Sequence, residues 1–178
     1  RQILNRHADP AINVASVDYL NDPAWQRGYA RLGAHGFSFD LQLYWPQMAD
    51  AAGLATRHPD IPVILNHTGM PLERDQAGLK GWRSGMRKLA QCPNVTAKIS
   101  GLGMVDNQWS EASIRPFVLD TIEIFGTERC LFASNFPVDK LYSDYTTLWR
   151  AFDAITAEFS ESERQAMFHD NAVRVYRL

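Results

Sequence analysis

The sequence has only two cysteines and no long apolar run. Cys92 and Cys130 lie far apart and form none of the paired spacings that zinc or redox sites use, so we expect reduced thiols in a cytoplasmic protein. No apolar stretch approaches the ~18 residues of a membrane span. The first residues also lack the apolar core of a signal peptide. We therefore expect neither a disulfide-framed secreted domain nor a membrane protein.

A surplus of one charge is missing as well. The 178 residues include 18 lysines and arginines against 20 aspartates and glutamates, a formal net charge of -2. Proteins that bind nucleic acid or anionic membranes usually carry a basic face, so we expect neither partner. The sequence also lacks the glycine-rich phosphate loops of nucleotide sites and the serine-centred nucleophile elbow. A small-molecule substrate is the partner that we expect.

Short apolar runs between turn-forming residues predict five buried strands, at residues 2–4, 37–41, 62–65, 95–99 and 130–133. Amphipathic stretches predict helices at residues 23–32, 46–57, 79–91, 110–125, 145–159 and 161–176. From the second strand on, the starts lie 25, 33 and 35 residues apart. A βαβ unit takes about 30 residues, so this spacing predicts consecutive parallel strands joined by helices.

We expect one domain over residues 1–178, because a domain usually takes about 100–200 residues. The strand spacing fits either a (β/α) barrel or an open, doubly wound α/β sheet. A complete TIM barrel of eight units needs ~250 residues and rarely fewer than ~200. A barrel made from this α/β chain would therefore be incomplete, truncated at its N-terminus and without the first strands.

Polar residues follow every predicted strand. Both architectures bind ligands at the carboxyl ends of their strands, so we expect these side chains to meet on one rim. They are Asn5, then Asp40, Gln42 and Tyr44, then Asn66 and His67, then Lys98 and Ser100, and finally Ser134 and Asn135.

His67 is the strongest single candidate. A neutral imidazole at a strand end can ligate a metal or accept a proton, although a hydrogen-bonded histidine in a packed loop is the simpler interpretation. Asn135 can orient water or a carbonyl but cannot act as a base, and it can also be a plain turn residue. Asp139, four residues later, is either a site carboxylate or a solvated or helix-capping acid.

Lys98 lies inside an apolar strand, where a lysine is costly unless it is paired. A functional or ion-paired role is therefore favoured for Lys98, and more weakly for Asp40. Gln42 is a candidate to bind substrate oxygens, and Tyr44 lies close enough to the rim to wall a pocket. We expect no chemical role for the other four histidines.

Several of these segments occur together in one known family. They are Ile64-Leu65-Asn66-His67-Thr68-Gly69-Met70-Pro71, Phe39-Asp40-Leu41-Gln42-Leu43-Tyr44, Lys98-Ile99-Ser100-Gly101-Leu102, Ala133-Ser134-Asn135-Phe136-Pro137 and the terminal Asn171-Ala172-Val173-Arg174-Val175-Tyr176. In order and spacing the sequence resembles the amidohydrolase superfamily, in its amidohydrolase-2 branch, close to the sugar-lactone and dicarboxylate-lactone hydrolases. The resemblance covers essentially the whole chain.

The resemblance implies a (β/α) barrel with its site on the C-terminal rim. Members that use a metal hold a divalent ion, often zinc, through a His-x-His pair on the first strand, a later histidine and an aspartate on the last strand. His67 matches the later histidine and is the expected metal ligand. The ion would polarise a lactone or amide carbonyl and lower the pKa of its bound water to about 7. Some lactonases of this branch are thought to work without metal.

Two departures from the family pattern matter. The chain contains no His-x-His pair, and Asn135 stands where the family has its aspartate. One hypothesis is a hydrolase that opens a small lactone or related cyclic ester. His67 would be the ligand or base, Lys98, Gln42 and Tyr44 would bind substrate oxygens, and Asn135 would orient water. A second hypothesis is a degenerate barrel homologue that persists as a homo-oligomer, and a third is a small-ligand-binding α/β module.

Overall fold

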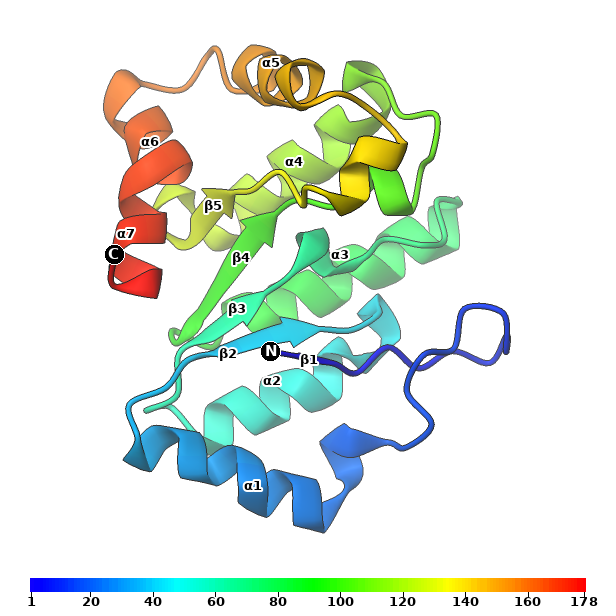
Figure 1. The fold of residues 1–178 in the computed structure, drawn as a ribbon, viewed down its shortest axis with the longest axis vertical. Coiled ribbons are helices and arrows are strands. Elements are labelled where there is room, and N and C mark those ends of the chain that lie inside the picture. Colours follow the sequence, from blue (N-terminus) through cyan, green and yellow to red (C-terminus); the bar gives the residue numbers. More distant parts are fainter.

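Five short parallel strands form one sheet in the computed structural model, which describes residues 1–178 (Figure 1). The strands are β1 (Gln2–Ile3), β2 (Phe39–Gln42), β3 (Val63–Leu65), β4 (Val95–Ile99) and β5 (Cys130–Phe132). Their order in the sheet is β1-β2-β3-β4-β5, so each strand pairs with its neighbours in sequence. All five predicted strands are therefore present.

This strand order decides between the two architectures that the sequence left open. A doubly wound sheet reverses its strand order at one point, and here no reversal occurs. Right-handed crossovers that always advance in one direction place their helices on one face of the sheet. The fold is thus an arc of a (β/α) barrel of the TIM type, with five of the eight strands that a closed barrel contains.

Helices follow each strand. They are α1 (Pro23–Ala34), α2 (Met48–Arg57), α3 (Gln76–Ala90) and α4 (Glu111–Phe125), and after β5 come α5 (Tyr145–Ile155), α6 (Glu161–Gln165) and α7 (Asn171–Tyr176). The predicted helices are confirmed, with ends that move by up to four residues. The last one is broken by a π-helical turn, Ala166–Asp170. Helices α2 to α5 pack in sequence against one another and form an outer layer.

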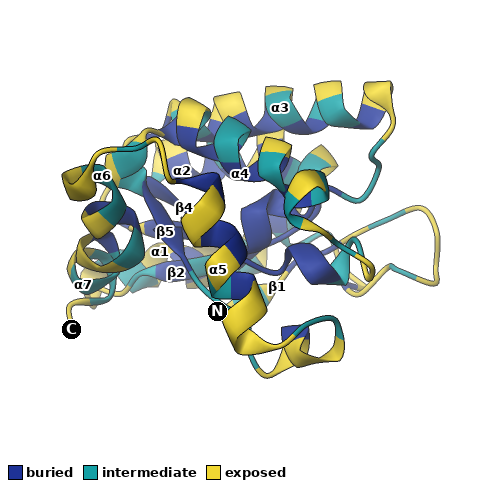
Figure 2. Ribbon diagram, turned by 90° about the horizontal axis from the view of Figure 1, so that it is seen from above, coloured by how far each residue is buried: buried dark blue, intermediate teal, exposed yellow.

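The two faces of the sheet differ in polarity because side chains alternate along a strand. On β2, Phe39 and Leu41 belong to the apolar core beneath the helices, whereas Asp40 between them points to the opposite, inner face. Lys98 on β4 likewise lies between two core residues. Figure 2 shows helices with exposed outer sides and buried sides toward the strands. The inner face is where charged groups can reach a ligand.

The C-terminal segment lies beside the amino ends of the strands (Figure 1). Asn171 donates hydrogen bonds from Nδ2 to the carbonyl oxygens of Thr127, at 2.7 Å, and Cys130, at 2.8 Å. The Tyr176 hydroxyl donates to Asp40 Oδ1 at 3.0 Å. The last helix is therefore fixed to β5 at one end and to the inner face of β2 at the other.

Both cysteines, Cys92 and Cys130, are buried and free, so the expectation of unpaired thiols is confirmed. None of the helices combines the length and the apolar character that crossing a lipid bilayer would require.

Candidate functional site

His67 lies directly beyond the end of β3 and is only 4% exposed. Its Nδ1 is 3.1 Å from Ser100 Oγ, just after β4, and its Nε2 is 3.4 Å from a terminal nitrogen of Arg1, just before β1. Arg1 also donates to Gln42 Oε1 at the end of β2. The structure thus brings together side chains from four consecutive strands.

The tautomer of His67 follows from its two neighbours. A guanidinium group can only donate, so Nε2 facing Arg1 is the acceptor nitrogen and the ring proton sits on Nδ1, where it donates to Ser100 Oγ. Burial, together with the positive charges of Arg1 and Lys98 and against an opposing effect of Asp40, lowers the pKa of His67 to about 3. His67 is therefore neutral at pH 7 and is a weak base.

Lys98 and Asp40 form an ion pair on the inner face, with Nζ 2.8 Å from Oδ1. This is the paired role that the burial argument favoured for Lys98. Tyr176 completes the group, because its hydroxyl donates to the same Asp40 oxygen and its ring centroid lies 5.0 Å from Lys98 Nζ. Burial and the nearby Asp40 carboxylate raise the pKa of Tyr176.

Tyr44, expected to wall a pocket, is buried, and its hydroxyl donates to the carbonyl oxygen of Ile12 at 2.8 Å. Burial raises the pKa of Tyr44. The hydroxyl is therefore used to hold the loop between β1 and α1 against the end of β2. Gln42, by contrast, presents its amide on the inner face, where Arg1 reaches it.

Asn135 and Asp139 lie beyond the end of β5 and contact each other. Asn135 Nδ2 donates to Asp139 Oδ1 at 2.9 Å, and Asp139 is 2% exposed. Burial raises the pKa of Asp139, partly offset by the hydrogen bond from Asn135. Asn135 lies at the same edge of the sheet as His67, two strands away, and the structure contains no hydrogen bond between them.

Unusual backbone conformations gather at this edge. Positive φ angles occur at His67 (56°), Thr68 (55°) and Met70 (46°) after β3, and at Asn135 (57°) after β5. Such conformations are uncommon outside glycine, and for a β-branched residue such as Thr68 they are true outliers. Strain of this kind persists only where the surroundings enforce it, and it concentrates at functional sites.

Two buried amides at the same edge lack partners. Asn66, 1% exposed, has no hydrogen bond to either side-chain polar atom, and Asn5 Oδ1 is equally unpartnered. A buried polar group without a partner is costly and in native proteins usually has a reason, such as a water, an ion or a catalytic role. Asn5 and Asn66 both belong to the polar residues that the sequence predicted at the strand ends.

Arg1 and Tyr176 are the two residues of this region that the sequence did not select. Arg1 carried a usable signal, because alternation along β1 places it on the same face as Asn5. Tyr176 carried none, since it ends the last helix and reaches Asp40 across 136 positions of sequence.

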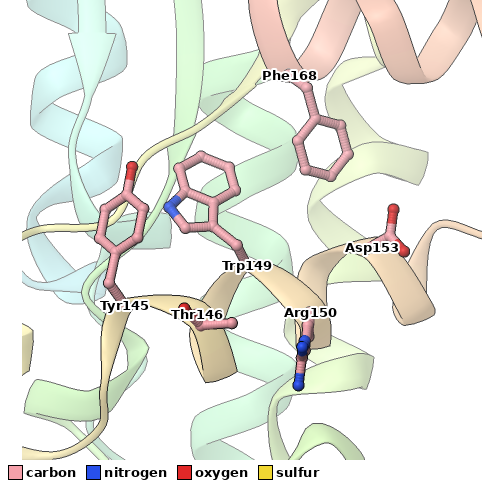
Figure 3. Close-up of a pocket in the computed structure, with 6 residues that line it drawn as sticks. All are labelled: Tyr145, Thr146, Trp149, Arg150, Asp153 and Phe168. Carbon is pink, nitrogen blue, oxygen red and sulfur yellow. The ribbon is translucent and has the colours of Figure 1, made fainter.

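A cavity of about 470 Å³ lies elsewhere, on the outer surface beside α5 (Figure 3). It is lined by Tyr145, Thr146, Trp149, Arg150, Asp153 and Phe168. No rim residue contributes to it, so this cavity and the site around His67 are separate features.

The donor atoms of this site do not form a binding site for the expected metal ion. No three histidine, cysteine, aspartate or glutamate side chains lie close enough together to hold an ion. Both ring nitrogens of His67 already face partners, and one of these is the cationic Arg1. The residues of this chain do not by themselves fit a divalent cation.

The sequence of this chain matches a known protein family. The family model described as Amidohydrolase, Amidohydro_2, matches residues 12–178. The chain belongs to this amidohydrolase family. Protein y4mH of Sinorhizobium fredii is 49% identical to it over 184 residues, which cover all of this amidohydrolase chain and 60% of y4mH. The L-fucono-1,5-lactonase of Burkholderia multivorans is 28% identical over 90% of the chain and 58% of the lactonase.

Solved structures agree on the fold. An amidohydrolase of Burkholderia multivorans with bound zinc superposes with a TM-score of 0.83 at 27% identity, over 90% of this chain and 59% of that one. A putative 2-pyrone-4,6-dicarboxylic acid hydrolase of Pseudomonas putida, at 20% identity and a TM-score of 0.76, supports the fold alone. The chain spans about 60% of the length of these relatives.

Proposed function

We propose that this amidohydrolase chain carries the site of a hydrolase that opens a small lactone or related cyclic ester by water attack on the carbonyl. The observation that carries the proposal is that the Arg1 side chain, from the start of β1, reaches Gln42 and His67 at the carboxyl ends of β2 and β3. We also propose that residues 1–178 act as one domain, since one apolar core runs under all five strands.

The roles follow from the chemistry of each group. The Arg1 guanidinium is a donor without a carboxylate partner, so it can bind the carbonyl oxygen and stabilise the negative charge that develops there. The Gln42 amide can hold a ring or hydroxyl oxygen beside it. His67, neutral and fixed by Ser100, offers Nε2 as an acceptor that orients the Arg1 guanidinium and is not a strong base. The Lys98 ammonium group, ion-paired with Asp40, adds a positive charge that acts on His67.

The relatives support this class of substrate. Two L-fucono-1,5-lactonases from Burkholderia species and an L-rhamnono-gamma-lactonase from Scheffersomyces stipitis are 28%, 26% and 24% identical to the chain. All three names describe hydrolysis of a sugar lactone.

The test is a screen of five- and six-membered aldonolactones with the protein that carries this chain, following acid release with a pH indicator. We expect hydrolysis of at least one lactone, and a loss of about 100-fold in kcat/KM for His67→Gln. The loss is comparable to that of one oxyanion donor, because the Arg1 guanidinium loses the acceptor that orients it. His35→Gln, which removes an exposed histidine, is the matched control and retains activity. Absence of hydrolysis across the screen would overturn the proposal.

A second candidate is a non-catalytic barrel homologue that associates with another copy. Exposed apolar side chains favour it, since Ile3 is 40%, Val14 61% and Val17 42% exposed. Exposed apolar surface promotes association. Sedimentation that finds only monomer would contradict this second candidate.

A further inference from the structure

Asp139 is the only aspartate or glutamate of this chain that is fully buried. It nevertheless has no ion-pair partner: no lysine, arginine or histidine lies within salt-bridge distance of its carboxylate. Its one side-chain hydrogen bond comes from the neutral amide of Asn135. Acidic side chains are almost never fully buried without a partner, so this carboxylate requires an explanation.

A structural role does not supply that explanation. Asp139 lies inside the short 3-10 helix Val138–Leu141, and no side-chain cap is formed there. Its backbone is held independently of its side chain, through Asn135 on one side and Tyr142 on the other. The second carboxylate oxygen, Oδ2, accepts no hydrogen bond and is not sealed off by protein. One oxygen is thus oriented and the other is available to a water.

Asn135 is committed to this arrangement. It sits in the left-handed region at φ 57°, as His67 does at φ 56°, and one of its two Nδ2 hydrogens goes to Asp139. An amide used in this way orients the carboxylate. The pair therefore places a carboxylate within the last-strand loop, although the residue nearest the strand is an amide.

The loop that carries Asp139 and the His67 side chain both lie against the same segment, residues 101–104. A Cβ added at Gly101 would lie 2.6 Å from His67 Nδ1, and one added at Gly103 would lie 3.0 Å from the Tyr142 ring. The segment 101–104 therefore lies against the imidazole of His67 through Gly101 and against Tyr142, three residues after Asp139, through Gly103. This contact makes the two loops parts of one rim.

We propose that Asp139 is the general base of the proposed lactone hydrolysis and that Asn135 is its positioning residue. The inference rests on the proposed function. The Asp139 carboxylate removes a proton from water while the water oxygen bonds to the lactone carbonyl carbon. The ring C–O bond then breaks, and the leaving alkoxide takes the proton from the Asp139 carboxyl. One water is consumed, an open-chain hydroxy acid is formed, and Asp139 returns to its carboxylate form.

Geometry separates the two candidate bases. The Nε2 atom of His67, which would have to accept the proton, faces the Arg1 guanidinium at 3.4 Å, whereas Oδ2 of Asp139 has no hydrogen-bond partner. Burial also raises the pKa of Asp139, which brings this carboxylate closer to the range in which a base works at neutral pH.

The experiment compares wild type, Asp139→Asn and Asn135→Ala on the lactone found in the screen, with Glu158→Gln as an exposed-carboxylate control. We expect Asp139→Asn to lower kcat by about 100-fold or more with little change in KM, and to abolish the acidic limb of the pH profile and the solvent isotope effect. Asn135→Ala keeps the acidic limb but moves it to higher pH, because the carboxylate loses its hydrogen bond.

Folding is followed separately, through Tm. Removal of an unpaired buried charge is expected to raise the Tm of Asp139→Asn at pH 7 and to leave it near wild type at pH 3. If wild type hydrolyses a lactone and folded Asp139→Asn retains more than a third of kcat, the assignment of the base is overturned while the proposed function stands. If wild type hydrolyses no lactone, both are overturned.

Discussion

Lys98 and Asp40 pair across the inner face at 2.8 Å, although β3 lies between the strands that carry them. Their side chains are 17% and 22% exposed, so water screens the pair only in part. The contact joins β4 to β2 over the top of β3 and gives the inner face a fixed charge arrangement.

Breaking this pair from one side is expected to destabilise the fold. Lys98→Met leaves Asp40 without its cation and should lower the free energy of unfolding by about 2 kcal/mol, less than for a sealed pair because both groups retain some solvent. The double variant Asp40→Asn with Lys98→Met is expected to recover part of the loss. Urea denaturation of these two variants and of the single variant Asp40→Asn measures the coupling, and additive losses would contradict a direct interaction.

The low pKa of His67 predicts a specific pH dependence of stability. The folded state holds the imidazole neutral down to about pH 3, whereas the unfolded chain protonates it near its ordinary pKa of about 6.5. Between these values the unfolded state binds more protons, so stability falls as the pH falls, by up to about 1.4 kcal/mol per pH unit. His67→Gln lacks this contribution. Denaturation curves from pH 7 to pH 4 measure the slopes, and equal slopes in the two proteins would refute the prediction.

Gly101 combines a left-handed backbone with a close approach to the imidazole. Its φ is +65°, and an added Cβ would lie 2.6 Å from His67 Nδ1. Gly36, with φ +62° and open space around it, is a matched control. Gly36→Ala is expected to cost about 1–2 kcal/mol from the backbone alone, and Gly101→Ala about 1–3 kcal/mol more from the displaced ring. Equal losses would show that the imidazole moves aside without cost.

The unpartnered amide of Asn66 predicts that an apolar replacement does not lower stability. Because a buried polar group without a hydrogen bond costs about 1–3 kcal/mol, Asn66→Leu should leave stability unchanged or raise it by about 1 kcal/mol. Asn94→Leu is the contrast, since Asn94 Nδ2 donates to the carbonyl oxygens of Ala55, His58 and Ile61. That change should cost about 2 kcal/mol or more. A large loss for Asn66→Leu would mean that a bound water satisfies the amide.

Local pattern was enough to predict the secondary structure. The apolar runs and their spacing predicted all five strands. These features depend on neighbours within a few residues, which a single sequence contains. The π-helical turn Ala166–Asp170 was not predicted, because its apolar periodicity does not differ from that of an ordinary helix.

The candidate site could be predicted only in part. His67, Asp40 and Lys98 could be predicted as site residues because they are polar residues near the carboxyl ends of parallel strands, which meet at one edge. The same reasoning could not assign partners. That Lys98 pairs with Asp40 and that His67 faces Ser100 depends on strand curvature and side-chain direction.

The sequence by itself determined the α/β class, the parallel repeat and the set of polar residues at the strand ends, because each is a property of short segments. The tertiary structure alone decided that the strand order runs without reversal, that Tyr176 reaches Asp40, and that Asp139 is buried without a cation. Each of these depends on how segments far apart in sequence pack together. Burial and ion pairing arise from that packing, so local pattern does not encode them.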